Sequence, residues 1–156
     1  MTEPGPENSC FGCGAANPRG MHLHFGEDVD PETGRRRIVG RFRLGAEYQG
    51  GGGFIHGGII ATVLDEVMSK VSRLSDVRTV TAELNVQYLK PVPVDADLLV
   101  TGFQVRREGR QLYHEGEIRD AAGKLLARGN GRFVVVDPER YGRQGSSRQA
   151  APVTPQ

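Results

Sequence analysis

Hydrophobic residues recur every three or four positions over residues 57–74, and this spacing predicts an amphipathic helix. The apolar face of this helix should comprise Ile59, Ile60, Val63, Leu64, Val67, Met68, Val71 and Leu74. Four consecutive glycines at 50–53 precede it and favour a loop, so we expect the helix to begin near Gly57.

The other patterned segments alternate between apolar and polar positions, which is typical of strands with one buried face. The predicted strands are 21–25, 37–44, 79–88, 97–107, 111–119 and 124–136. Short turns that contain glycine join the last three, which predicts an antiparallel meander. One long helix among such strands predicts an α+β domain, with the helix laid on one face of an antiparallel sheet.

Both ends of the chain lack this pattern. Residues 1–9 are rich in proline, glycine and glutamate, and residues 137–156 are polar without apolar periodicity. We therefore expect a flexible leader at 1–9, one domain at 10–136 and a mostly disordered tail at 137–156. A chain of 156 residues is long enough for one domain with one modest core.

Charge and composition exclude several classes of partner. Twenty basic residues nearly balance nineteen acidic ones, so a nucleic-acid binder that works through a broad positive field is not expected. No run approaches the ~20 apolar residues that span a bilayer, and the first residues lack the features of a signal peptide. We expect no membrane partner and a cytoplasmic location. Two cysteines do not make a disulfide framework.

The sequence at the start of the helix, His56-Gly57-Gly58, offers one candidate site. A helix that begins with two residues lacking side chains exposes its first backbone N–H groups, and the helix dipole adds positive potential there. Such donors favour the oxyanion that forms when an acyl carbonyl is attacked. The alternative is that the glycines only allow close packing of the helix.

Asp65 lies on the polar stripe of the same helix, with Thr62, Ser69 and Arg73. It is either a solvent-facing side chain or a carboxylate aimed at an organised site. Gly58 precedes it by seven residues, so the two share one side of the helix but stand roughly 10 Å apart along its axis. If both act on one thioester, two helices must meet antiparallel across a two-fold axis, which predicts a homodimer with composite sites.

Three segments together resemble a known family. The run from His56 to Glu66 looks like the helix signature of hotdog-fold acyl-CoA thioesterases of the PaaI type. Residues 81–91 resemble the strand that follows in that family, and residues 10–21 are similar to the start of many bacterial members. The resemblance implies a central helix wrapped by an antiparallel sheet, a homodimer or dimer of dimers, and hydrolysis of acyl-CoA without a cofactor.

The resemblance also implies roles for individual residues. Asp65 would be the general base or nucleophile, and the N–H of Gly57 or Gly58 would receive the oxyanion. Thr81 would help to position the water, and His56 would orient the loop or the thioester. Family members commonly carry an amide residue a few positions before the histidine. Here the nearest amide is Gln49, which either fills that role through a shifted loop or leaves it vacant.

Cationic side chains near the ends of strands are candidates for binding the phosphates of CoA. These are Lys90, Arg128 and Arg132, although each is also consistent with ordinary surface charge. The rival function from another class is a non-catalytic acyl-CoA binding module on the same fold.

Cys10-x-x-Cys13 followed by His22 and His24 imitates a zinc site, because thiolate and imidazole are suitable zinc ligands. However, the two histidines stand two apart on a predicted strand and crowd one face of it. We therefore favour a packed structural leader and predict no metal.

The glycines at 50–53 lack the Gly-Lys-Ser/Thr of a phosphate-binding loop, so we expect a flexible lip over the acyl site.

Overall fold

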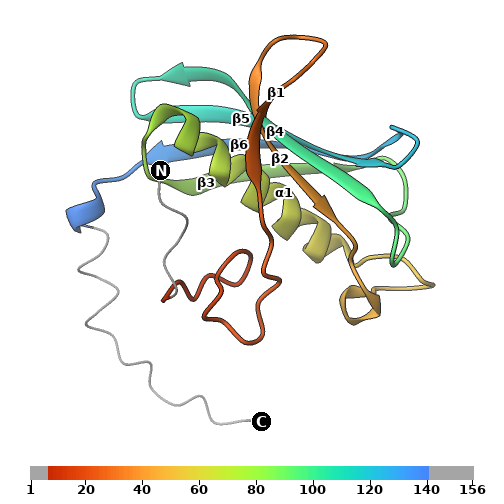
Figure 1. Ribbon diagram of the computed structural model, residues 1–156. Helices are drawn as coiled ribbons and strands as arrows, with labels where there is room; N and C mark the ends of the chain where they lie inside the picture. Colours follow the sequence, from red (N-terminus) through yellow and green to blue (C-terminus); the bar gives the residue numbers. More distant parts are fainter. Residues whose placement is uncertain (1–6, 141–156) are drawn as a thin grey trace.

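The computed structural model describes residues 7–140, and within them the chain forms one long α-helix, two short 3₁₀ helices and six strands, and residues 138–140 are also helical (Figure 1). In chain order the elements are β1 (Gly26–Val29), β2 (Arg36–Phe42), η1 (Ala46–Tyr48), α1 (Gly57–Val71), η2 (Ser72–Ser75), β3 (Thr79–Tyr88), β4 (Leu98–Glu108), β5 (Gln111–Asp120) and β6 (Leu125–Val135). Most of the predicted leader and tail, residues 1–6 and 141–156, lies outside the described residues.

The six strands form one sheet in the order β1-β2-β4-β5-β6-β3, and every neighbouring pair is antiparallel. The predicted meander is confirmed as β4-β5-β6. Its two turns contain Gly109 (φ +59°) and Gly123 (φ +82°), and this backbone conformation favours glycine. β3 comes earlier in the chain but pairs with β6, so it forms one edge of the sheet.

α1 lies across one face of this sheet, as Figure 1 shows. Its buried positions match the predicted apolar face: Ile60, Val63, Leu64, Val67, Met68 and Val71 are each at most 2% exposed. The α-helix ends at Val71, and the predicted extension to Leu74 continues as the 3₁₀ helix η2. Asp76, in the left-handed conformation at φ +52°, ends it.

A row of three glycines sets the distance between α1 and the sheet. Gly102, Gly116 and Gly129 lie opposite one another on β4, β5 and β6. A Cβ at Gly102 would stand 3.0 Å from the carbonyl oxygen of Val67, and a Cβ at Gly129 would stand 2.9 Å from Met68 Cε. Side chains at these positions would push the helix outward, so the glycines allow its close approach.

The strand predicted at 21–25 is wrong. Residues 21–25 form no strand, although Leu23 is buried between the exposed His22 and His24, as the alternation of apolar and polar residues predicted. However, His22 adopts φ +54°, which interrupts a strand. The backbone N–H groups of Met21 and Leu23 donate to carbonyls in the preceding loop, Phe11 and Gly12, rather than to the sheet. The first strand forms only at Gly26–Val29.

Among the described residues, no helix has the length and apolar character needed to cross a bilayer.

His114 on β5 is a buried titratable group that the sequence did not single out. It is 1% exposed, its ring stacks on Phe133 with centroids 4.9 Å apart, and its Nδ1 lies 2.8 Å from the carbonyl oxygen of Met68. Since that oxygen can only accept, Nδ1 carries the proton. Burial lowers the pKa of His114 to about 4, partly opposed by the Met68 hydrogen bond.

This lowered pKa predicts a pH-dependent stability. Unfolded His114 binds a proton below about pH 6.5, whereas the folded protein resists protonation until about pH 4. The contribution is therefore complete above the unfolded pKa and is lost as pH falls towards 4. Denaturant unfolding should show the wild type losing about 1–2 kcal/mol more between pH 7 and 5 than His114→Gln, whose amide still donates but does not titrate. Equal losses in both proteins would contradict the assignment.

Candidate active site

The first turn of α1 is capped by the side chain of His56. His56 is the N-cap residue, and its Nδ1 accepts the backbone N–H of Gly58 at 2.9 Å. The N–H groups of Ile59 and Ile60 donate to the carbonyl oxygen of His56. The N–H of Gly57 has no partner in the described part of the chain, so of the two predicted oxyanion donors it is the one left free.

Tyr88, which sequence reasoning missed, holds the other side of the same turn. Its hydroxyl donates to the carbonyl oxygen of Gly57 at 2.8 Å, and its ring would be 3.5 Å from a Cβ at Gly57. Tyr88 is the last residue of β3 and is 57% exposed, which is unusual for a large aromatic side chain. Its position at the end of an alternating strand was the only signal available in the sequence.

Asp65 and Thr81, two of the predicted site residues, are brought together by the fold. The Thr81 hydroxyl donates to Asp65 Oδ1 at 2.7 Å, joining the middle of α1 to the start of β3. Asp65 is half-buried, and burial raises the pKa of its carboxyl group. The Thr81 hydrogen bond lowers this pKa, and the neighbouring Glu66 raises it further. The carboxylate is thus a constrained, partly desolvated group rather than an ordinary surface acid.

A β-bulge turns Thr81 towards the helix. Pairing between β3 and β6 shifts after Thr81, which faces Phe133, so that Glu83 faces Arg132 and Ala82 is the extra residue. In a regular strand Thr81 and Glu83 would share one face. Here Thr81 reaches Asp65 on the helix side, whereas Glu83 pairs with Arg132 on the opposite side.

The two parts of the candidate site lie along one edge of the domain but are separated. Asp65 is eight residues from Gly57 on a continuous helix, which corresponds to about 12 Å along the axis. Thr81 and Tyr88 both belong to β3, an edge strand of the sheet. The chain therefore presents a carboxylate and a helix start beside β3, an edge strand of the sheet.

The glycine loop folds back beside the helix start and brings Gln49 near it. The backbone of Gln49 forms an isolated bridge with Ile55, and the N–H of His56 donates to the carbonyl oxygen of Tyr48 at 2.9 Å. The Gln49 side chain is exposed. Gly52 and Gly53 have positive φ values of 61° and 81° at the tip of the loop. Gln49 therefore lies opposite Ile55, the residue directly before His56.

The three predicted phosphate-binding cations do not gather at this site within one chain. Arg128 pairs with Glu117 at 3.0 Å, and Arg132 pairs with Glu83 at 3.5 Å. Both alternate along β6 with buried residues, among them Gly129, which faces α1, so they lie on the sheet face away from Asp65. Only Lys90 lies near the glycine loop, in a surface hollow that Phe54 also lines.

The leader packs its two cysteines against α1 instead of forming the site with His22 and His24. Cys10 Sγ lies 3.4 Å from Glu66 Oε1, and Lys70 Nζ lies 2.8 Å from Cys13 Sγ. Burial raises the pKa of the Cys13 thiol, and the Lys70 hydrogen bond opposes this. Both histidines are exposed, and His22 Nε2 bonds to the carbonyl oxygen of Asn17 at 2.7 Å.

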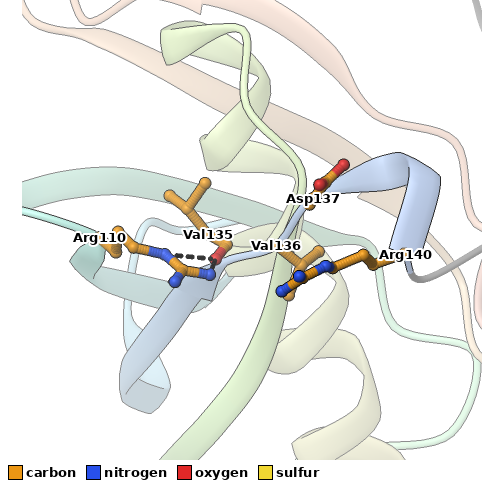
Figure 2. Close-up of a pocket in the computed structure, with 5 residues that line it drawn as sticks. All are labelled: Arg110, Val135, Val136, Asp137 and Arg140. Atoms are coloured by element: carbon orange, nitrogen blue, oxygen red, sulfur yellow. Dashed lines mark hydrogen bonds between the residues drawn. The ribbon is translucent and has the colours of Figure 1, made fainter.

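A surface hollow near the end of β6 is shown in Figure 2, where Arg110 donates to the carbonyl oxygen of Val135. Val136, Asp137 and Arg140 complete its lining. None of the predicted site residues lines it, and its only acid is Asp137, so we do not assign the chemistry to this hollow.

The chain is similar in sequence to known thioesterases. Residues 52–127 match the family model of the thioesterase superfamily. The mouse protein named acyl-coenzyme A thioesterase THEM4 is 35% identical over 106 residues, which are 67% of this chain and 46% of that protein. A Saccharomyces cerevisiae protein named uncharacterized mitochondrial membrane protein FMP10 is 29% identical over 104 residues, 64% of this chain and 43% of that protein. The chain spans less than half the length of both relatives.

Solved structures share the fold. A crystal structure of protein RHA08564, described as a thioesterase superfamily protein, is 28% identical with a TM-score of 0.68, covering 78% of this chain and 60% of that one. The Escherichia coli PaaI protein from the phenylacetic acid degradation operon is 17% identical with a TM-score of 0.62, covering 65% and 73%. The predicted α+β hotdog architecture is confirmed.

Proposed function

Because this chain belongs to the hotdog-fold thioesterase superfamily, we propose that it hydrolyses acyl-CoA thioesters to a free acid and CoA. The observation that carries the proposal is the Asp65 carboxylate, half-buried on α1 and held at one oxygen by the Thr81 hydroxyl. A second support is the free N–H of Gly57 at the start of the same helix. A general base and an oxyanion donor are the two parts that acyl hydrolysis requires.

In the proposed reaction, Thr81 occupies Asp65 Oδ1 and leaves Oδ2 to a water. Asp65 takes a proton as the water oxygen bonds to the acyl carbon. The resulting oxyanion accepts the N–H of Gly57, a contact worth about 3 kcal/mol in a preorganised site. The carbon–sulfur bond then breaks, and the CoA thiolate leaves and takes up the proton held by Asp65, which regenerates the carboxylate. His56 acts as a positioning residue, because its Nδ1 is already used in capping the helix.

The catalytic unit in this proposal is a homodimer, alone or within a dimer of dimers. Asp65 and Gly57 of one chain are too far apart to serve one carbonyl. β3 is a ten-residue edge strand, and Tyr88 and Leu89 at its end are 57% and 46% exposed. Isologous pairing of two β3 strands covers this edge and sets the two helices antiparallel, so that Asp65 approaches the partner's Gly57.

Analytical ultracentrifugation of the active protein tests this assembly. We expect the species that hydrolyses acyl-CoA to sediment as a dimer or larger, and activity per chain to fall on dilution below the dissociation constant. A monomer that retains full activity would contradict the composite site.

Substitution of Asp65 tests the chemistry. Asp65→Asn keeps the shape and a hydrogen-bond partner for Thr81 but cannot accept a proton, so kcat should fall about 10²- to 10⁴-fold. Binding of acyl-CoA, measured by calorimetry, should change little. Asp76→Asn is the matched control, since Asp76 is exposed and asparagine tolerates its left-handed backbone.

The result also separates the rival function. If the wild type binds acyl-CoA but releases no free thiol with short, medium, long or aromatic acyl chains, the chain is a binding module and Asp65 is not catalytic.

Of the predicted CoA contacts, Lys90 is retained here because it lies beside the glycine loop. A cytoplasmic location stays a prediction, since one relative carries a mitochondrial name.

A further inference from the structure

Three ligand-type side chains converge where the leader meets α1. The Sγ atoms of Cys10 and Cys13 and a carboxylate oxygen of Glu66 all lie within 4.8 Å of one another. Cys13 is buried, and the Glu66 side chain is 13% exposed. This group is held by a local turn and a helix, two elements brought together by the fold rather than by neighbouring positions in the sequence.

The surrounding backbone is shaped for this convergence. The N–H of Gly14 donates to the carbonyl oxygen of Cys10 at 2.8 Å, which closes the turn that carries both cysteines. A Cβ at Gly12 would overlap the carboxyl group of Glu66, so only glycine admits that carboxylate beside the turn. Glu66 Oε2 is buried and makes no hydrogen bond within residues 7–140, and the Lys70 ammonium lies 3.3 Å from it as an ion-pair partner. A buried carboxylate beside two thiols, with one ammonium contact and no hydrogen bond at this oxygen, favours a further cation.

We propose that Cys10, Cys13 and Glu66 bind a zinc ion, with a water in the fourth tetrahedral position. Two thiolates and one carboxylate are suitable zinc ligands, and Cys-x-x-Cys is a common spacing for them. His22 and His24 are the remaining ligands that the sequence offers, and with that set no metal is predicted. In the structure both are exposed and lie outside this group. Glu66, forty-four residues beyond His22, supplies the third ligand instead.

Lys70 completes the charge balance of the site. Its ammonium group lies 2.8 Å from Cys13 Sγ and 3.3 Å from Glu66 Oε2. Three anionic ligands, a doubly charged zinc and one ammonium sum to zero, as a largely buried site requires. A hydrogen bond from a second-shell N–H to a zinc-bound thiolate is also a usual feature of such sites. The alternative is a Lys70–Glu66 ion pair beside two neutral thiols.

The zinc fastens the leader to α1 at the residue next to Asp65. Residues 8–14 contribute few large apolar side chains to the core, and Phe11 is 47% exposed. A bond from two leader cysteines to Glu66 supplies the attachment that the loop's own packing does not. The inference stands on this cluster alone and does not depend on the proposed thioesterase activity.

The test uses the full chain, purified in a phosphine reductant without chelator. Elemental analysis should find about one zinc per chain in the wild type. Titration of the zinc-free protein with Co²⁺ should give a thiolate-to-cobalt charge-transfer band, and zinc should abolish it. Cys10→Ser, Cys13→Ser and Glu66→Gln should each lose zinc, whereas the His22→Ala/His24→Ala double variant should retain it. Circular dichroism checks that each variant folds.

Three outcomes would overturn the proposal. In the first, the reduced wild-type protein contains no zinc and gives no charge-transfer band with Co²⁺. This result requires no variant, and it supports the Lys70–Glu66 ion pair beside two neutral thiols. A second is loss of zinc in the histidine double variant, which would restore the ligand set suggested by the sequence. The third is a Cys10–Cys13 disulfide that forms readily in air while the reduced protein ignores both metals, which would make the pair a redox element.

Discussion

The close contact between α1 and the glycine row of the sheet is the constraint on which the rest of the domain depends. Gly102, Gly116 and Gly129 present only backbone to Val67 and Met68, and this fixes the height of the helix above the strands. At that height Asp65 reaches Thr81, and the carbonyl oxygen of Gly57 reaches Tyr88. A helix pushed outward by one added side chain would separate both pairs, so the core and the candidate site share one determinant.

Local patterns predicted the elements well because each pattern reports which face of a segment is buried. The helix start at Gly57, the strand at 79–88 and the meander follow from periodicity and turn glycines alone. The same signal misled at 21–25, because burial of Leu23 comes from packing under the leader loop and not from strand pairing. Periodicity does not distinguish these two sources of burial.

The partners within the site were less predictable, since they depend on register and on contacts between distant segments. Asp65 and His56 could be named from the sequence, but not the bulge at Ala82 that turns Thr81 inward. Tyr88 was missed for the same reason, and Arg128 and Arg132 were assigned without knowing which sheet face they occupy. The contact of Glu66 with Cys10 spans fifty-six positions, and no local pattern encodes it.

In the proposed dimer, each site joins Asp65 of one subunit to the helix start of the other, and a mixed-dimer experiment tests this arrangement most directly. Gly57→Pro removes the proposed oxyanion-binding N–H. Proline fits at this position because Gly57 is the first residue of α1 and follows a residue with an extended backbone. The Asp65→Asn and Gly57→Pro proteins should each be nearly inactive on their own. When equal amounts are unfolded and refolded together, about half of the dimers should be mixed, and each mixed dimer holds one intact site out of two. The mixture should therefore recover about a quarter of wild-type activity. If the two proteins form mixed dimers without any recovery, the site lies within one chain and the two-subunit account is wrong.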